Sequence, residues 1–164
     1  MNRLVTQKSE TAQWYALVND AQFSAGLQFA EDVESYLVFM LMRYCNKPDM
    51  VTRILAVDYM KGQLSQGRCQ SQRLQEVGDH CLILSGLFPM RAERLNVSVQ
   101  YFVGLGQGAY QTLATAGGQG LESLYADLGQ QFVALVRLLE AMRDLGPESG
   151  RWWSSGSLAG NLAH

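Results

Sequence analysis

The chain has 164 residues, a length typical of a single domain. Its apolar fraction of 48% excludes an intrinsically disordered protein. The net charge of −2 argues against general nucleic-acid binding, which depends on a strong basic field.

The apolar runs and the cysteines indicate the cellular compartment of the protein. The longest apolar runs, at 37–42 and 81–84, are far shorter than the ~20 residues that span a bilayer. The N-terminus lacks the apolar stretch of a secretory signal. Three cysteines cannot all pair within one chain, and none has a C-x-x-C spacing. These features predict a cytoplasmic protein.

Two segments near the N-terminus have the pattern of amphipathic helices. The first is expected over 10–22, because Ser9 is placed to cap it and apolar residues recur at helical spacing. The second is expected over 28–44, with acidic residues near its start and Arg43 near its end, as the helix dipole favours. Its part 36–42 is apolar on every side, which suits the centre of a bundle or a subunit interface.

Prolines and glycines mark the next two elements. Pro48 suits the first turn of a helix over 48–64, and a further helix is expected over 70–87. Gly78 is predicted to interrupt this second helix, after which Asp79 could cap the chain again.

The stretch 101–110, Tyr-Phe-Val-Gly-Leu-Gly-Gln-Gly-Ala-Tyr, contains G-x-G-x-x-A, a form of the dinucleotide-binding fingerprint. That fingerprint needs a parallel sheet, and no convincing companion strand is found. The same residues fit one face of a helix, for which Ser98 is a candidate cap. We therefore predict a helix with a small-residue notch that a neighbouring helix packs into, formed by Gly104, Gly106, Gly108 and Ala109.

The last long segment has apolar residues spaced by seven: Leu121, Leu128, Leu135 and Met142. This stripe predicts one helix of about 25 residues that ends at Gly146-Pro147. It could zip against another subunit, or it could lie along the core of its own bundle. Residues 147–164 are expected to form a tail, partly disordered or folded back, whose Trp152 and Trp153 could pack on the bundle or hook a partner.

Few residues are suited to catalysis or metal binding. His80 is the sole histidine away from the C-terminus, and Cys81, its sequence neighbour, points in another direction on a helix. A helical di-iron site needs a second histidine, and neither a G-x-S-x-G elbow nor a P-loop is present. We predict no catalytic residue, cofactor or metal.

The middle of the chain resembles a family of small, uncharacterised bacterial helical proteins. The matching residues lie over about 75–115: Gly78-Asp79, Gly86-Leu-Phe-Pro89, Tyr101-Phe102, Gly106 and Ala109-Tyr110. The resemblance implies an all-helical bacterial protein and brings no activity with it. It indicates where a pocket would be sought, around Asp79, His80, Arg91, Arg94 and Tyr101.

The sequence therefore predicts an all-α bundle of about six helices over 1–146, in the form of a homodimer. The first functional hypothesis is a non-enzymatic protein that binds another protein or its own copy. The second is a ligand-binding or catalytic bundle with a pocket near Asp79 and His80. A nucleic-acid-associated regulator ranks third, because residues 43–94 hold eight Lys/Arg against five Asp/Glu.

Overall fold

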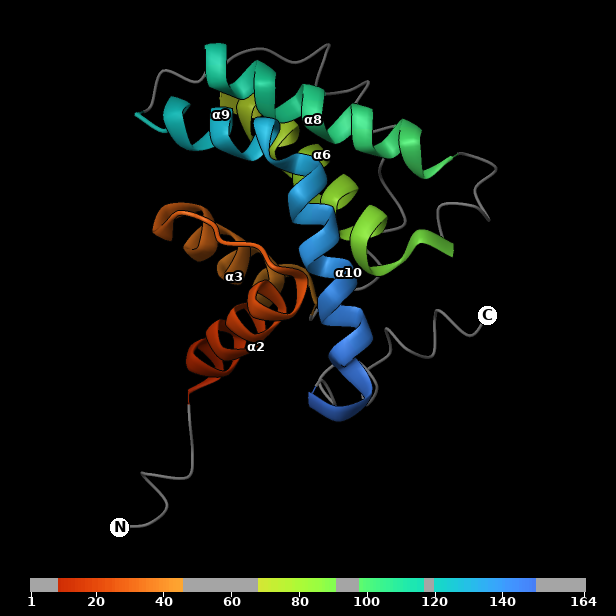
Figure 1. Cartoon of the computed structure of the whole chain (residues 1–164). Helices are drawn as coiled ribbons and strands as arrows, with labels where there is room; N and C mark the ends of the chain where they lie inside the picture. The colour runs from red at the N-terminus through yellow and green to blue at the C-terminus, as the bar shows by residue number, and fades with distance from the viewer. Residues whose placement is uncertain (1–8, 46–67, 91–97, 117–119, 150–164) are drawn as a thin grey trace.

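The computed structural model describes residues 9–45, 68–90, 98–116 and 120–149 (Figure 1). Within these ranges six long helices and no strand are found, which confirms the prediction of an all-α bundle. The helices are α2 (Glu10–Ala25), α3 (Glu31–Cys45), α6 (Arg68–Leu87), α8 (Val99–Ala116), α9 (Glu122–Gln130) and α10 (Phe132–Ser149). The helix predicted over 48–64 lies outside the described residues, as do Trp152 and Trp153. None of the described helices is long and apolar enough to cross a membrane.

The first helix begins and ends where its local chemistry allows. The Ser9 side chain accepts a hydrogen bond from the amide of Ala12 at 3.1 Å, so the predicted N-cap is present. Gly26 ends the helix with a φ of 68°, a left-handed conformation that a glycine adopts without steric cost. The helix therefore extends three residues beyond the predicted end at Gln22.

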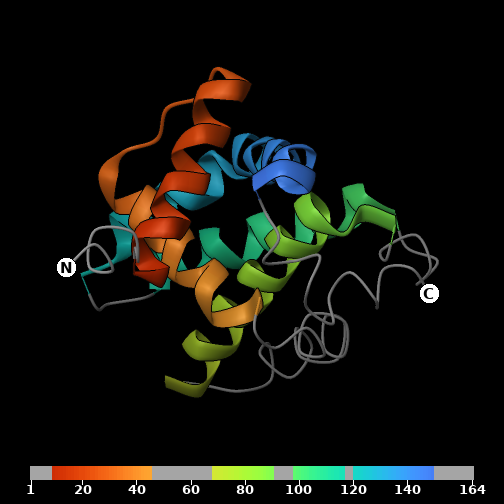
Figure 2. The same ribbon diagram turned by 90° about the horizontal axis from the view of Figure 1, so that it is seen from below.

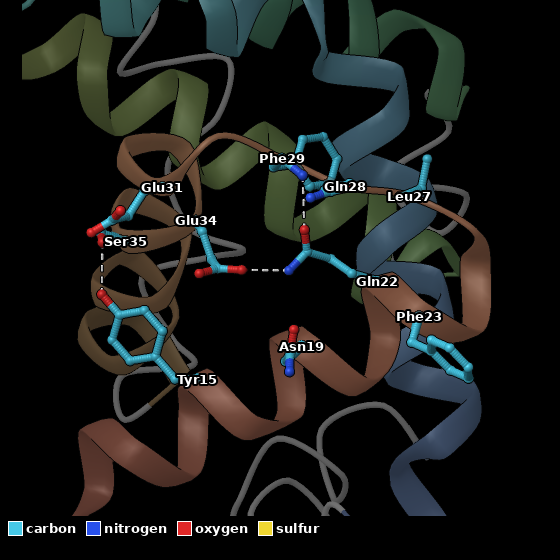
Figure 3. A pocket seen from close by; sticks show the side chains of 10 residues that line it. All are labelled: Tyr15, Asn19, Gln22, Phe23, Leu27, Gln28, Phe29, Glu31, Glu34 and Ser35. Carbon is cyan, nitrogen blue, oxygen red and sulfur yellow. Dashed lines mark hydrogen bonds between the residues drawn. The ribbon is translucent and has the colours of Figure 1, made fainter.

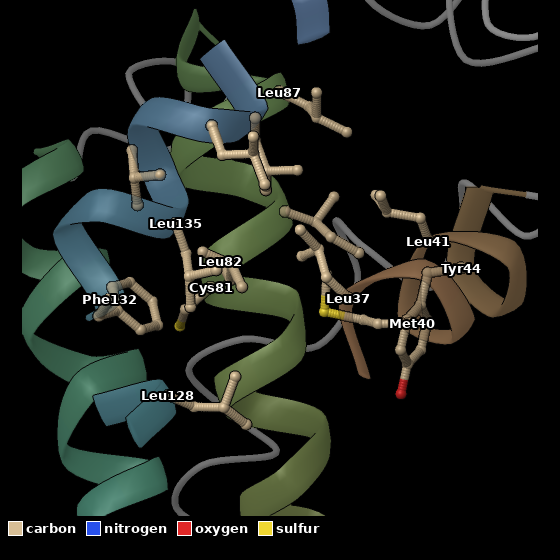
Figure 4. Packing of buried hydrophobic residues seen from close by; sticks show 14 of the residues in the cluster. Leu37, Met40, Leu41, Tyr44, Cys81, Leu82, Leu87, Leu128, Phe132 and Leu135 are labelled. Atoms are coloured by element: carbon tan, nitrogen blue, oxygen red, sulfur yellow. The ribbon is translucent and has the colours of Figure 1, made fainter. Parts of the chain in front are cut away.

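Helix α10 is central to the bundle. It packs against α2 on one side and against α6 on the other, while α6 pairs with α8 and α8 with α9 (Figures 1 and 2). Helix α3 pairs with α2. The buried side chains of α3, α6, α9 and α10 meet in one continuous apolar core (Figure 4). The helix pair α2–α3 thus sits beside the layer made by α6, α8 and α9.

The single long helix predicted over 121–145 is wrong, because the structure divides it into α9 and α10 at Gln131. Gln131 leaves the helical conformation, with φ −100° and ψ 16°. The Gln107 side chain of α8 donates a hydrogen bond to the carbonyl of Gly129 at 3.0 Å. This contact ties α9 to α8, whereas α10 turns away to reach α2 (Figure 1). Gly146-Pro147 does not end the segment either, since α10 continues to Ser149.

The apolar stripe of this segment belongs mainly to the core. Leu128, Leu135 and Met142 are buried, whereas Leu121 precedes α9 and is 43% exposed. Burial of three of the four positions within one chain assigns them to packing of α9 and α10 on their own neighbours.

The predicted interruption at Gly78 is also wrong, because α6 runs without a break from Arg68 to Leu87. Gly78 instead allows close packing between α6 and α8. A Cβ atom built on Gly78 would lie 2.5 Å from Cε1 of Tyr110 on α8, so only glycine leaves room for that ring. The residue that follows, Asp79, is thereby placed inside the bundle and caps no helix.

The stretch 101–110 forms part of α8. This confirms the prediction of a helix and excludes the alternative, a phosphate-binding turn between a strand and a helix. The Ser98 side chain accepts a hydrogen bond from the amide of Tyr101 at 3.2 Å and caps this helix. A Cβ atom on Gly106 would lie 2.5 Å from Cζ of Phe132 and 2.7 Å from Cβ of Cys81. Helices of the same chain, α10 and α6, therefore fill the notch at Gly106. Ala109 is buried on that face, whereas Gly104 is exposed and a Cβ atom on Gly104 or Gly108 would meet nothing within 4 Å in the described structure.

Candidate functional sites: a buried carboxylate cluster and an open cleft

Asp79 lies at the centre of a polar cluster inside the bundle. Its Oδ1 atom accepts two hydrogen bonds, one from the hydroxyl of Tyr36 on α3 at 2.6 Å and one from the hydroxyl of Tyr110 on α8 at 2.5 Å. Its Oδ2 atom lies 3.9 Å from Nη1 of Arg43, whose side chain is 50% exposed. Tyr125 of α9 completes the cluster, with its ring stacked on Tyr110 and edge-on to Tyr36.

Burial sets the protonation behaviour of this cluster. Loss of solvent raises the pKa of Asp79 to about 6, although the two phenols and Arg43 counteract part of this rise. The pKa of Tyr36 and that of Tyr110 are raised well above their usual value, because burial and the neighbouring Asp79 both disfavour a phenolate. The phenols are therefore permanent donors near neutral pH, and the carboxyl group is the member that titrates.

His80 follows Asp79 on α6 and is also buried. Its ring lies edge-on to Tyr44 at 4.7 Å between centroids, and the Arg43 guanidinium lies 5.5 Å from the centroid of the same Tyr44 ring. Neither ring nitrogen of His80 has a hydrogen-bond partner in the part of the chain that the structure describes. Burial lowers the pKa of His80 to about 4, so the imidazole is neutral at physiological pH.

The predicted pocket residues are placed as follows. Asp79 and His80 lie together in the core, and Tyr101 lies on α8 with 51% of its surface exposed and its ring against Phe102. Arg91 and Arg94 lie outside the described residues. The polar partners of Asp79, above all Tyr36 and Tyr110, were not foreseen, since tyrosines at helical spacing look like ordinary core residues. Within the described residues, no group of three or more His, Cys, Asp or Glu side chains could hold a metal ion.

An open cleft lies between α2 and the N-terminal part of α3 (Figure 3). Its volume is about 630 Å³, and ten side chains line it: Tyr15, Asn19, Gln22, Phe23, Leu27, Gln28, Phe29, Glu31, Glu34 and Ser35. Two of them are carboxylates, and none is a lysine or an arginine. The Phe23 side chain is 90% exposed.

Side-chain hydrogen bonds fix the walls of the cleft. Buried Gln22 donates from Nε2 to Oε2 of Glu34 at 2.6 Å and accepts from the amide of Phe29 at 2.8 Å. The hydroxyl of Tyr15 donates to Oγ of Ser35 at 2.7 Å, so a second bond joins α2 to α3 (Figure 3). This site was not predicted from the sequence, although a glutamine among the apolar residues of the first helix is a signal that could have found it.

Comparison of the chain with protein-family models, with curated proteins and with solved structures finds no match. The resemblance of residues 75–115 to a bacterial helical family therefore stays a prediction.

Proposed function

We propose that the protein is a non-enzymatic binding module, whose α2–α3 cleft receives a segment of another protein that carries a lysine or arginine beside an apolar side chain. The observation that carries this proposal is the open cleft of about 630 Å³ with two carboxylates and a Phe23 side chain that is 90% exposed. Sites for small molecules and short side-chain groups have volumes of this order.

Charge supports a cationic occupant. Glu31 and Glu34 lie three residues apart on α3, so both carboxylates belong to one face of the helix, and both line the cleft. No positive side chain among the ten lining residues neutralises them. Gln22 engages one oxygen of Glu34 with an uncharged amide, which orients the carboxylate without removing its negative charge.

Phe23 supports an apolar contact beside the charge. A phenylalanine with 90% of its surface in water is unfavourable in isolation, and aromatic side chains are enriched among the anchors of protein interfaces. It stands on the last turns of α2 at the rim of the cleft (Figure 3). A partner that covers the ring while placing a cation against Glu31 and Glu34 uses both features.

The walls are ordered in advance, which lowers the entropy cost of binding. The Gln22 and Tyr15 hydrogen bonds hold α2 and α3 at a fixed separation. Asp79 and His80 do not line this cleft, so the proposal involves neither of them.

The test is a titration of the isotopically labelled protein, followed by its amide NMR shifts, with three unlabelled peptides that each pair a leucine with two lysines, two glutamines or two glutamates. The lysine peptide is expected to perturb residues of α2 and α3 and to bind most tightly at low salt. Replacing Glu31 and Glu34 by glutamine should lower the affinity for the lysine peptide about threefold or more. Phe23→Ala should lower the same affinity about tenfold. Asp20→Asn and Tyr101→Ala are matched controls, because both residues are exposed and lie outside the cleft.

Two results contradict the proposal. One is the absence of any shift in the cleft with all three peptides. The other is a concentration-dependent shift of the same signals without peptide, together with a dimer in light scattering, because the occupant is then a second copy of this chain.

A further inference from the structure

We propose that Asp79 is a proton-operated switch for Arg43: the ionised carboxylate holds the guanidinium at the surface of the bundle, and uptake of one proton by Oδ2 releases it to solvent. This inference goes beyond the binding function and does not depend on it. It rests on how the two oxygens of one buried carboxyl group are shared among their neighbours.

The two oxygens of Asp79 have different surroundings. Oδ1 is occupied by two phenol donors, Tyr36 from α3 and Tyr110 from α8. Oδ2 is buried and receives no hydrogen bond in the described structure, and its charged neighbour is Arg43 at 3.9 Å. That separation is too long for a hydrogen bond but allows Coulomb attraction.

The site of protonation follows from this division. A proton on Oδ1 would compete with the two hydroxyl donors, whereas Oδ2 has a free lone pair. Oδ2 also faces Arg43, so the proton and the guanidinium neutralise the same atom and exclude one another. Since the Arg43 side chain is half exposed, its side of the cluster is also the side that lies nearest to solvent.

The remaining groups around Asp79 leave Arg43 as its cation in the described part of the bundle. The phenols of α3, α8 and α9 (Tyr36, Tyr110 and Tyr125) stay neutral because burial raises the pKa of each. On α6 itself, Glu76 adds a negative charge that raises the pKa of Asp79, and neutral His80 turns to Tyr44.

Protonation changes the surface without dismantling the cluster. The step transfers one proton from solvent to Oδ2, and no other bond forms or breaks. Tyr36 and Tyr110 keep their hydrogen bonds to Oδ1, so α3, α6 and α8 remain joined. Arg43 loses its counter-charge and keeps its contact with the Tyr44 ring, so within the described residues the guanidinium at the C-terminal end of α3 is left without a carboxylate partner.

The test is an NMR titration from pH 4 to 8 that follows the Asp79 side-chain carboxyl carbon and the Nε–H group of Arg43. Both signals are expected to move with one common midpoint near 6, while the Nε–H signal of Arg137 on α10 reports general effects of pH. In Asp79→Asn the inflection at Arg43 should vanish. In Arg43→Gln the carboxyl midpoint should rise, because its cation is gone.

Other outcomes overturn the proposal. An Arg43 inflection that persists in Asp79→Asn shows that another group moves the guanidinium. A carboxyl midpoint that is the same in Arg43→Gln and in the natural chain shows that the two are not coupled. The second variant changes only a half-exposed side chain, so it remains informative even where Asp79→Asn does not fold.

Discussion

Tyr110 on α8 donates a hydrogen bond of 2.5 Å to Asp79 on α6, and both side chains are fully enclosed by the bundle. The pair exists because Gly78, the residue before Asp79, leaves space for the Tyr110 ring. Gly78, Asp79 and Tyr110 thus form one contact between α6 and α8, with the carboxylate and the phenol 31 residues apart in the sequence.

Removal of the Tyr110 hydroxyl, which donates to Asp79, should destabilise the protein. In Tyr110→Phe the ring still fills its space against Gly78 and Phe132, but Oδ1 loses one of its two donors. A hydrogen bond to a charged group contributes about 1.5–3 kcal/mol, so we expect a loss of this order in the free energy of unfolding by urea at pH 7.5. Tyr101→Phe is the control, because this tyrosine is half exposed on the same helix. Equal stability of the two variants would contradict the prediction.

The dependence of stability on pH should reveal two opposed titrations. The pKa of Asp79 is raised to about 6 in the folded state, so the folded protein binds more protons than the unfolded chain between about pH 4 and 6. This contribution to stability falls as pH rises through that window. The pKa of His80 is lowered to about 4, so the folded protein binds fewer protons between about pH 4 and 6.5, and this contribution rises.

Single substitutions should expose each titration in turn. Asp79→Asn leaves the His80 contribution, so stability should rise from pH 4 to 6.5 more steeply than in the natural chain. His80→Gln leaves the Asp79 contribution, so stability should fall from pH 4 to 6. Each change amounts to at most about 3 kcal/mol, from 1.36 kcal/mol per pKa unit. Urea unfolding at pH steps of half a unit measures both, and slopes of the opposite sign would refute the assignment.

Two glycines of α8 should respond in opposite ways to alanine. Gly106→Ala places a Cβ atom against Phe132 and Cys81, so the helices must separate, and we expect a loss of about 1–3 kcal/mol. Gly104→Ala meets nothing within 4 Å in the described structure and lies at an exposed helical position. It should gain up to about 1 kcal/mol through helix propensity. Thermal unfolding of both variants, compared with the natural chain, measures these two effects. A lower stability of Gly104→Ala would contradict the prediction, because it would mean that the Gly104 face of α8 is packed against another segment.

Gln22 should be more important than its position at the end of a surface helix suggests. In Gln22→Ala, Glu34 loses an amide donor and the amide of Phe29 loses its acceptor. We expect about 1–3 kcal/mol of destabilisation and faster hydrogen exchange at Phe29. Gln28→Ala is the control, since this exposed glutamine lines the same cleft. If exchange at Phe29 is unchanged, Gln22 does not order the cleft.

The sequence by itself determined the helical class and much of the element order. The period of apolar residues and the caps at Ser9 and Ser98 are local features. They predicted the bounds of α2, α3 and α6 to within a few residues and the helical state of α8. Local signals were enough there because capping and helical amphipathicity act within a few residues of the chain.

Tertiary structure alone decided the rest. The continuous helix at Gly78 and the helix break at Gln131 both lie beside contacts with α8, from the Tyr110 ring and the Gln107 amide respectively, and neither contact is visible in the local sequence. Asp79 looked like a helix cap, yet donors from α3 and α8 make it the centre of a buried cluster. The cleft depends on how α2 and α3 face each other. Periodicity shows which face of a helix is apolar, but the partner of each face is selected by packing between segments distant in the chain.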